Sequence, residues 1–167
     1  MKIGIYSDIH DHISNLEKTL HYFKNHNIEH TFFCGDFCSP IPAKVIGNSG
    51  VLTHCVFGNG DADRFTIQNL AFNQFSNLKL NSEYAVIELN NKKIVMTHYP
   101  FYAKALAKSG EYDLVLCGHT HESNIELIDQ TWLINPGEVM GWKGNPSFAV
   151  YDFKTNTVDL IKINDLP

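Results

Sequence analysis

The sequence predicts a mixed α/β fold in which two packed, mixed β-sheets are flanked by helices. In the first third of the 167 residues, short apolar runs alternate with amphipathic runs, which is typical of a βαβαβ unit. In the remainder, apolar runs follow one another across polar turns, which is typical of antiparallel hairpins. This mixture favours two mixed sheets over a single doubly wound sheet.

The first third contains three buried runs and three helical patterns. The expected strands are residues 2–7, 30–34 and 51–57. Ser14 and Glu17 have the spacing of a capping box, and apolar residues with helical spacing follow, so a helix is expected over 15–25. Pro42 suits the first turn of a short helix that ends at Gly47. A third helix is expected over 62–72.

The remaining elements are mostly strands. Asn90-Asn91 is expected to join strands 83–89 and 92–97 in a tight hairpin. A helix over 100–109 is expected to end at Gly110, before a buried strand over 113–117. Polar turns separate the last four expected strands, which are residues 124–128, 131–134, 147–153 and 158–163.

The composition indicates one domain over residues 1–167 with a sizeable core, because 44% of the residues are hydrophobic. Lys+Arg 13 against Asp+Glu 18 give a net charge of −5, so long nucleic acid is not an expected partner. The apolar runs are too short to span a membrane, and the first residues do not resemble a signal peptide. The four cysteines are expected to be free thiols in a reducing, cytoplasmic compartment. Strand edges in the last hairpins could pair chains into a homo-oligomer.

The most informative feature is that five apolar strands each end beside residues that can bind a metal ion. Because the carboxyl ends of strands in open α/β sheets face the ligand site, these residues are expected to converge. Histidines without such a partner pattern, such as His21 and His54, are expected to be ordinary surface or core residues. The seven candidate ligands are Asp8, His10, Asp36, Asn59, His98, His119 and His121.

Carboxylates and imidazoles packed together without a cation would be costly, and divalent metals remove that cost. Seven ligands exceed the four of one tetrahedral site, so two divalent ions are expected, with Asp36 as the candidate bridge. Oxygen and imidazole donors suit Mn²⁺, Ni²⁺, Fe²⁺, Zn²⁺ or Co²⁺. Mn²⁺ is the expected ion.

The order of these motifs resembles that of the calcineurin-like metallophosphoesterase superfamily. The matching motifs are Asp-x-His, Gly-Asp, Gly-Asn-x-Asp, a strand-end His and Gly-His-Thr-His. The length and the later Asn135-Pro136-Gly137 resemble the small single-domain bacterial and archaeal phosphodiesterases of that superfamily. The resemblance spans residues 2–153 and implies a four-layer αββα sandwich with a two-metal site between the sheet ends.

The resemblance also implies a function and a division of the ligands. The implied function is a metal-dependent phosphodiesterase, in which a metal-bridging hydroxide attacks the phosphorus of a small phosphate ester in line. Asn59 and His98 would count among its catalytic residues. One metal would be held by Asp8, His10, Asp36 and His121, and the other by Asp36, Asn59, His98 and His119.

The chain departs from the superfamily pattern first at Gly60, where many members have a histidine proposed to protonate the leaving group. Asp61, Asp11 and His12 are the candidates to replace it, although capping at the helix start is the favoured role for Asp11 and His12. Without a general acid, a preference for good leaving groups is expected.

Two further departures concern the surroundings of the site. Tyr99 stands where glycine is common, and it either narrows the pocket, stacks on a substrate ring or packs structurally. Glu138 stands where serine is usual. Its carboxylate either lies near the site, where it would disfavour dianionic monoesters, or points to solvent.

Four alternatives compete with the phosphodiesterase interpretation. A non-catalytic, metal-binding scaffold of the same fold is less favoured because all seven ligand positions are intact. A nuclease of the same superfamily is less favoured by the acidic charge, and a phosphomonoesterase stays open. A flavodoxin-like domain would need a Gly-rich phosphate loop after the first strand, where Asp8-Ile9-His10-Asp11 stands instead.

Overall fold

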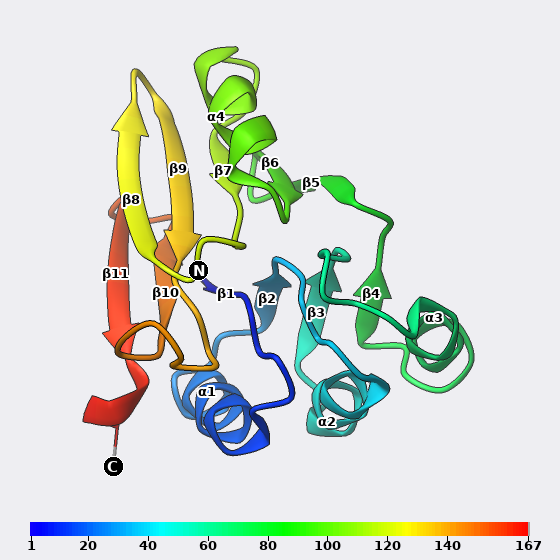
Figure 1. The fold of residues 1–167 in the computed structure, drawn as a ribbon. Coiled ribbons are helices and arrows are strands. Elements are labelled where there is room, and N and C mark those ends of the chain that lie inside the picture. Colours follow the sequence, from blue (N-terminus) through cyan, green and yellow to red (C-terminus); the bar gives the residue numbers. More distant parts are fainter. Residues whose placement is uncertain (167) are drawn as a thin grey trace.

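Two mixed β-sheets lie face to face between helices in the computed structural model, which describes residues 1–166 (Figure 1). The first sheet has the order β11-β10-β1-β2-β3-β4 and the second the order β5-β6-β7-β9-β8. The strands of the first sheet are β1 (Lys2–Tyr6), β2 (His30–Phe33), β3 (Leu52–Cys55), β4 (Leu78–Leu80), β10 (Ser147–Asp152) and β11 (Thr157–Lys162). Those of the second are β5 (Tyr84–Leu89), β6 (Lys92–Thr97), β7 (Leu114–Leu116), β8 (Ser123–Ile128) and β9 (Thr131–Pro136).

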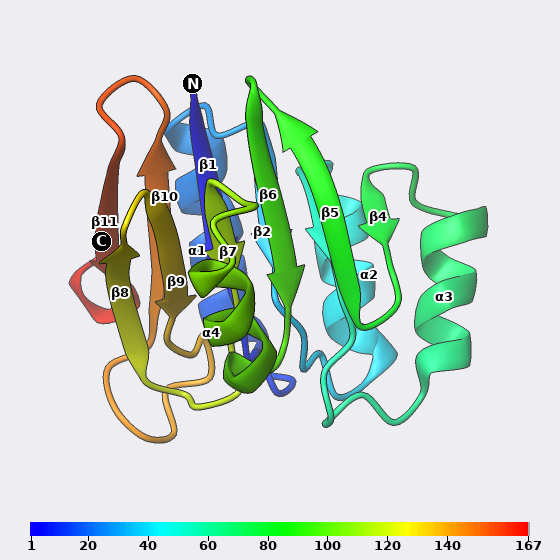
Figure 2. The ribbon, with the colours of Figure 1, turned by 90° about the horizontal axis from the view of Figure 1, so that it is seen from above.

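The helices form the outer layers. The helices α1 (Ile13–Asn25), α2 (Pro40–Ser49) and α3 (Arg64–Asn73) lie on the side of the first sheet, and α4 (Pro100–Lys108) covers the second (Figures 1 and 2). A 3₁₀ turn, η1 (Ile163–Asp165), follows β11. One apolar cluster fills the space between the sheets, and two more lie under the helices. The predicted fold class, two mixed sheets flanked by helices, is therefore confirmed.

Strand direction brings the candidate residues to one edge. β1, β2, β3 and β4 run parallel, and so do β6, β7 and β9 in the other sheet. The chain crosses from the first sheet to the second through residues 81–83 and returns through residues 137–146. Both crossings leave from the carboxyl ends of parallel strands, so they lie at the same edge as the candidate site.

Several predicted element boundaries are wrong. The capping box at Ser14 does not form, because α1 begins at Ile13 and the His12 side chain accepts a hydrogen bond from Asn15 N at 3.3 Å. Helix α2 begins at Pro40 and continues through Gly47 to a left-handed cap at Gly50. Gly47 is needed inside the helix because a Cβ there would overlap the Phe75 ring.

The sequence did not predict the strand β4, and some predicted strands are shorter in the structure. β4 has three residues, too few for an alternating pattern to be recognised. The predicted strand 51–57 is reduced to β3, because the chain turns toward the site beyond Cys55. The Asn90-Asn91 hairpin is confirmed, with φ angles of 52° and 58° that suit a type I′ turn.

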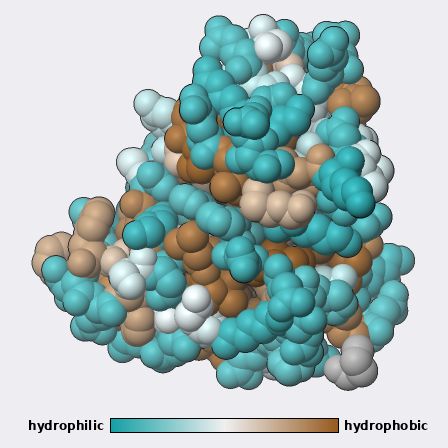
Figure 3. Space-filling view, turned by 180° about the vertical axis from the view of Figure 1, so that it is seen from behind, coloured by the Kyte–Doolittle hydropathy of each residue, from teal (hydrophilic) through white to brown (hydrophobic). Residues whose placement is uncertain are grey.

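The surface is mostly hydrophilic on the face opposite the site. Hydrophobic groups gather there in a band between the layer around α4 and the layer of α1 to α3 (Figure 3). Within residues 1–166, no helix is both long enough and apolar enough to cross a bilayer.

Candidate metal centre

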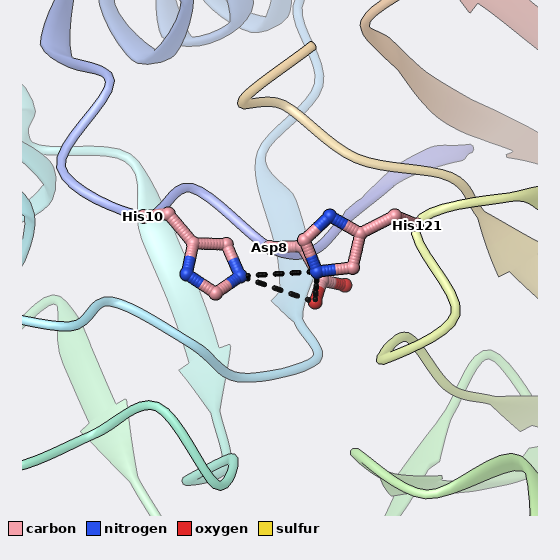
Figure 4. Close-up of side chains that lie close together, drawn as sticks. All are labelled: Asp8, His10 and His121. Carbon is pink, nitrogen blue, oxygen red and sulfur yellow. Dashed lines mark hydrogen bonds and ion pairs between the residues drawn. The ribbon is translucent and has the colours of Figure 1, made fainter. Parts of the chain in front are cut away.

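The five strand ends bring the seven predicted residues together at one edge of the sandwich. His10 Nε2 lies 3.2 Å from His121 Nε2, and His121 Nε2 lies 3.3 Å from Asp8 Oδ1. We call Asp8, His10 and His121 the first cluster (Figure 4). We call Asn59, His98 and His119 the second cluster. In it, His98 Nε2 lies 3.1 Å from Asn59 Oδ1 and 3.2 Å from His119 Nδ1.

Asp36 lies between the two clusters. Its Oδ2 atom is 3.4 Å from His10 Nε2 and also 3.4 Å from His98 Nε2. Its Oδ1 atom accepts a hydrogen bond of 2.6 Å from the Gly60 amide, which fixes the carboxylate plane. One oxygen is therefore held by the backbone while the other faces both clusters.

Hydrogen bonds on the far side of each ring orient the imidazoles. His98 Nδ1 donates to the Cys34 carbonyl at 2.8 Å, and His121 Nδ1 donates to Glu138 Oε2 at 2.6 Å. His10 Nδ1 shares a hydrogen bond of 3.0 Å with Cys38 Sγ. Because Nδ1 carries the proton in the first two rings, their Nε2 atoms present lone pairs to the site.

The backbone at these strand ends is unusual. Five candidate ligands have φ angles between 42° and 73°, a left-handed conformation that non-glycine residues rarely adopt, and they are Asp8, His10, Asp36, His119 and His121. Such strain concentrates at functional sites. At Gly118 a Cβ would overlap Ser7 Oγ, and at Gly58 it would overlap Asp36 Oδ1. Glycine at these two positions therefore permits a close approach that a Cβ would block.

Buried carboxylates set the electrostatics of the site. Burial acts to raise the pKa of Asp36, but the hydrogen bond and charge of His98 lower this pKa overall. Burial acts to lower the pKa of His98, and the Asp36 carboxylate raises it overall. The neighbouring Asp8 raises the pKa of His10. The raised pKa values of His10 and His98 thus show that the buried carboxylates favour a positive charge at these two positions.

The donor set fits divalent cations. Asp8 is fully buried, and its Oδ1 atom has no hydrogen-bond partner within residues 1–166. His98 Nε2 and His121 Nε2 each lie 3.2 Å from another imidazole nitrogen. A buried carboxylate oxygen without a donor is unfavourable unless a cation lies beside it. Oxygen and imidazole donors suit the first-row divalent metals named above.

The other predicted catalytic candidates have contacts of their own. Asp61 is buried, and its carboxylate accepts hydrogen bonds from the Gly58, Asp36 and Cys38 amides at 2.7, 3.2 and 3.1 Å. Burial, the largest cause, raises the pKa of Asp61. His12 caps α1, as noted above. These contacts favour structural roles, and a proton-donor role for either residue stays a prediction.

Asp11 has a structural contact as well. Its carboxylate accepts a hydrogen bond of 2.5 Å from Ser39 Oγ, and Ser39 is the N-cap of α2. The favoured helix-start role for Asp11 is thus seen in a modified form, since it supports the cap of α2 and not α1.

Sequence reasoning did not identify the partners that orient the histidines. Glu138 is buried against His121, so the option that it points to solvent is wrong. Cys38, expected to be a free thiol without a role in the site, lies against His10. Neither position belongs to a motif with the ligand that it contacts, since 28 residues separate Cys38 from His10 and 17 separate Glu138 from His121. Only the fold brings these pairs together.

A cavity of about 380 Å³ opens onto the site. Its walls combine the candidate ligands with two residues of the β9–β10 connection. The lining residues are His10, Asp36, Asn59, His119, His121, Met140 and Trp142.

Comparison with known proteins identifies the family. Residues 1–156 match the model of the calcineurin-like phosphoesterase superfamily domain. The chain belongs to this superfamily. A phosphodiesterase of Methanocaldococcus jannaschii is 34% identical over 155 residues, which cover 91% of this chain and 93% of the relative. The predicted enzyme class, a hydrolase of phosphoric ester bonds, is confirmed by these matches.

Solved structures of the superfamily agree with the fold. A structure described as a novel archaeal phosphodiesterase superposes with a TM-score of 0.90 at 32% identity, over 97% of this chain and 99% of that one. The phosphoesterase YfcE of E. coli superposes with a TM-score of 0.69 over 98% and 100% of the two chains. Its identity is 20%, so it bears on the fold alone.

Proposed function

We propose that this protein is a metal-dependent phosphodiesterase with a dinuclear centre, acting on a small phosphate ester. The observation that carries the proposal is the position of Asp36. Its Oδ2 atom is equally distant, at 3.4 Å, from an imidazole nitrogen of each cluster. A carboxylate oxygen shared by two donor clusters is suited to bridging two cations.

The two clusters and Asp36 supply the donors for two cations. Asp8, His10 and His121 with Asp36 would hold one cation, and Asn59, His98 and His119 with Asp36 would hold the other. Mn²⁺ is the cation that we propose, with Ni²⁺, Fe²⁺, Zn²⁺ and Co²⁺ as alternatives. Bound cations would supply a hydroxide for in-line attack on phosphorus and would polarise the phosphoryl oxygens.

The residues of the chain position these donors and limit the substrate. His98 and His121 are held by their Nδ1 protons, so little reorganisation is needed when a cation and a substrate bind. The Glu138 carboxylate lies directly behind His121 and adds negative charge at this end of the site. A diester carries one negative charge fewer than a monoester dianion and is the better fit.

The position of the usual histidine of the superfamily is occupied by Gly60, whose amide is committed to Asp36. The chain then offers no imidazole at that position to protonate a leaving group, a contribution of about 10²–10⁴-fold where it exists. We therefore propose a preference for diesters with good leaving groups.

A metal-by-substrate screen tests the proposal. Chelator-treated protein is reloaded with each of the five divalent ions and assayed on bis-p-nitrophenyl phosphate, p-nitrophenyl phosphate and an alkyl monoester. We expect the diester to be hydrolysed fastest, with Mn²⁺ restoring activity. Faster turnover of the alkyl monoester would contradict the preference.

Elemental analysis separates the enzyme from the scaffold alternative. Protein purified without chelator is expected to contain close to two equivalents of metal. Metal binding without turnover of any ester would indicate a scaffold, and absence of bound metal together with no rescue by Mn²⁺ or Ni²⁺ would contradict the dinuclear centre.

A further inference from the structure

Trp142 is an exposed tryptophan on the wall of the cavity. It lies in the β9–β10 connection, its side chain is 73% exposed, and it lines the cavity together with His10, Asp36 and His121. Its ring centroid is 6.0 Å from that of His121, with the planes at 77°. A large aromatic surface left in water beside a reactive site is a favourable place for a planar ligand group.

The loop holds Trp142 in place at the rim. On one side of it, Val139 N donates to Ser7 O and Met140 N donates to Asp8 O, both at 3.0 Å. On the other side, the Glu138 carboxylate accepts hydrogen bonds from the Lys143 and Gly144 amides at 2.5 and 3.2 Å. The ring is therefore presented by a backbone that is tied down on both sides, which lowers the entropy lost when a ligand stacks on it.

The charges around the cavity restrict the ligand further. None of the residues that line it is a lysine or an arginine. Lys143, which follows Trp142, donates its ammonium to the Thr120 carbonyl at 2.9 Å. The lining itself therefore offers no side-chain cation for the additional charges of a ligand with several phosphate groups. A single phosphodiester linkage with a planar substituent matches an aromatic wall next to one charged centre.

We infer that Trp142 is a specificity-determining residue that stacks on a planar ring of the substrate, so that the preferred substrates are phosphodiesters of a nucleoside or a related aromatic alcohol. This inference rests on the proposed phosphodiesterase function. Stacking of a base on an aromatic side chain is sequence-tolerant, because every base has a π-face, and it does not require a hydrogen-bond donor on the protein.

Inhibition by compounds that resemble the product tests the inference. This test does not require knowing which of the two ester bonds of the substrate is hydrolysed. Thymidine 5′-monophosphate and ribose 5-phosphate are both pentose 5-phosphates. The first carries a base at C1, and the second carries a hydroxyl group there and one more hydroxyl group at C2. Their inhibition constants are measured for the wild type, Trp142→Ala and Trp142→Phe with bis-p-nitrophenyl phosphate and Mn²⁺. We expect Trp142→Ala to weaken inhibition by thymidine 5′-monophosphate about tenfold, Trp142→Phe to weaken it less, and neither to change inhibition by ribose 5-phosphate.

Fluorescence gives a second measurement that does not depend on turnover. In Trp132→Phe protein, Trp142 is the one remaining tryptophan, and thymidine 5′-monophosphate, but not ribose 5-phosphate, is expected to quench its emission. Equal effects of Trp142→Ala on both inhibitors, or no quenching specific to the nucleotide, would overturn the inference. The proposed function fails separately, if wild-type protein hydrolyses no diester with any of the metals.

Discussion

The two clusters of the site are oriented in different ways. In the first cluster, His10 and His121 are held by side chains, Cys38 Sγ and Glu138 Oε2. In the second cluster, His98 is held by the Cys34 backbone carbonyl, which follows β2 directly. His98 of the second cluster is thus fixed by the main chain, whereas the two histidines of the first cluster depend on two replaceable side chains. Substitutions can therefore weaken one half of the site while the other half is retained.

The largest effect is expected where the two halves meet. Asp36→Ala removes the carboxylate that faces both clusters, so binding at both should fail together. We expect less than a tenth of the wild-type rate on bis-p-nitrophenyl phosphate. Asp159→Ala, at an exposed aspartate of β11, is the matched control and should behave as the wild type. Retention of more than a tenth of the rate would refute the bridging role.

Glu138→Gln is expected to affect the first cluster alone. Loss of the charge behind His121 should reduce metal affinity by about 10- to 100-fold at one site and leave the other near its wild-type value. Calorimetric titration of metal into the chelated protein separates the two binding events. Glu126→Gln, an exposed glutamate of β8, is the control. An equal loss at both sites would show that the two halves are not independent.

Cys38→Ala is expected to have a smaller effect on the same cluster. The variant removes one hydrogen bond to His10 Nδ1, which is worth about 0.5–1.5 kcal/mol, or roughly 2- to 12-fold in affinity. Cys38→Ser keeps a hydrogen-bonding group and should recover most of the loss. If Cys38→Ser binds metal as weakly as Cys38→Ala, the hydrogen bond to His10 does not support the first cluster.

The smallest effect is a difference in the pH dependence of stability with and without metal. The pKa values of His10 and His98 are raised in the folded protein. Their stabilising contribution is therefore complete below the unfolded value of about 6.5 and is lost as pH rises through the folded pKa. Chelated protein should lose stability above about pH 6.5, measured by urea unfolding.

The metal-loaded protein should show the opposite trend over the same range, because ligand imidazoles must be deprotonated to bind a cation. Both forms are unfolded in urea between about pH 6 and 8, one series with chelator and one with Mn²⁺. Parallel curves for the two series would show that the histidines do not exchange protons for metal.

The candidate site was more predictable than its supports. Each ligand motif directly follows an apolar strand, and the rule that strand ends converge requires no knowledge of packing. The contact of Glu138 with His121 depends on the path of the β9–β10 connection, which local sequence does not specify. The fold has a similar case at Gly47, which local sequence predicts to end the helix. The structure places it inside α2, because the Phe75 ring packs where a Cβ would lie, and this contact is not specified by local sequence.

Both covalent links between the sheets, residues 81–83 and 137–146, lie at the edge that carries the site. At the opposite edge, the described residues of the two sheets are joined by side-chain packing. Local unfolding that separates the two sheets should therefore begin at that opposite edge, where the backbone does not connect them. The donor atoms lie at the edge where the backbone connects the two sheets, so the distances between them would change little while the opposite edge opens and closes.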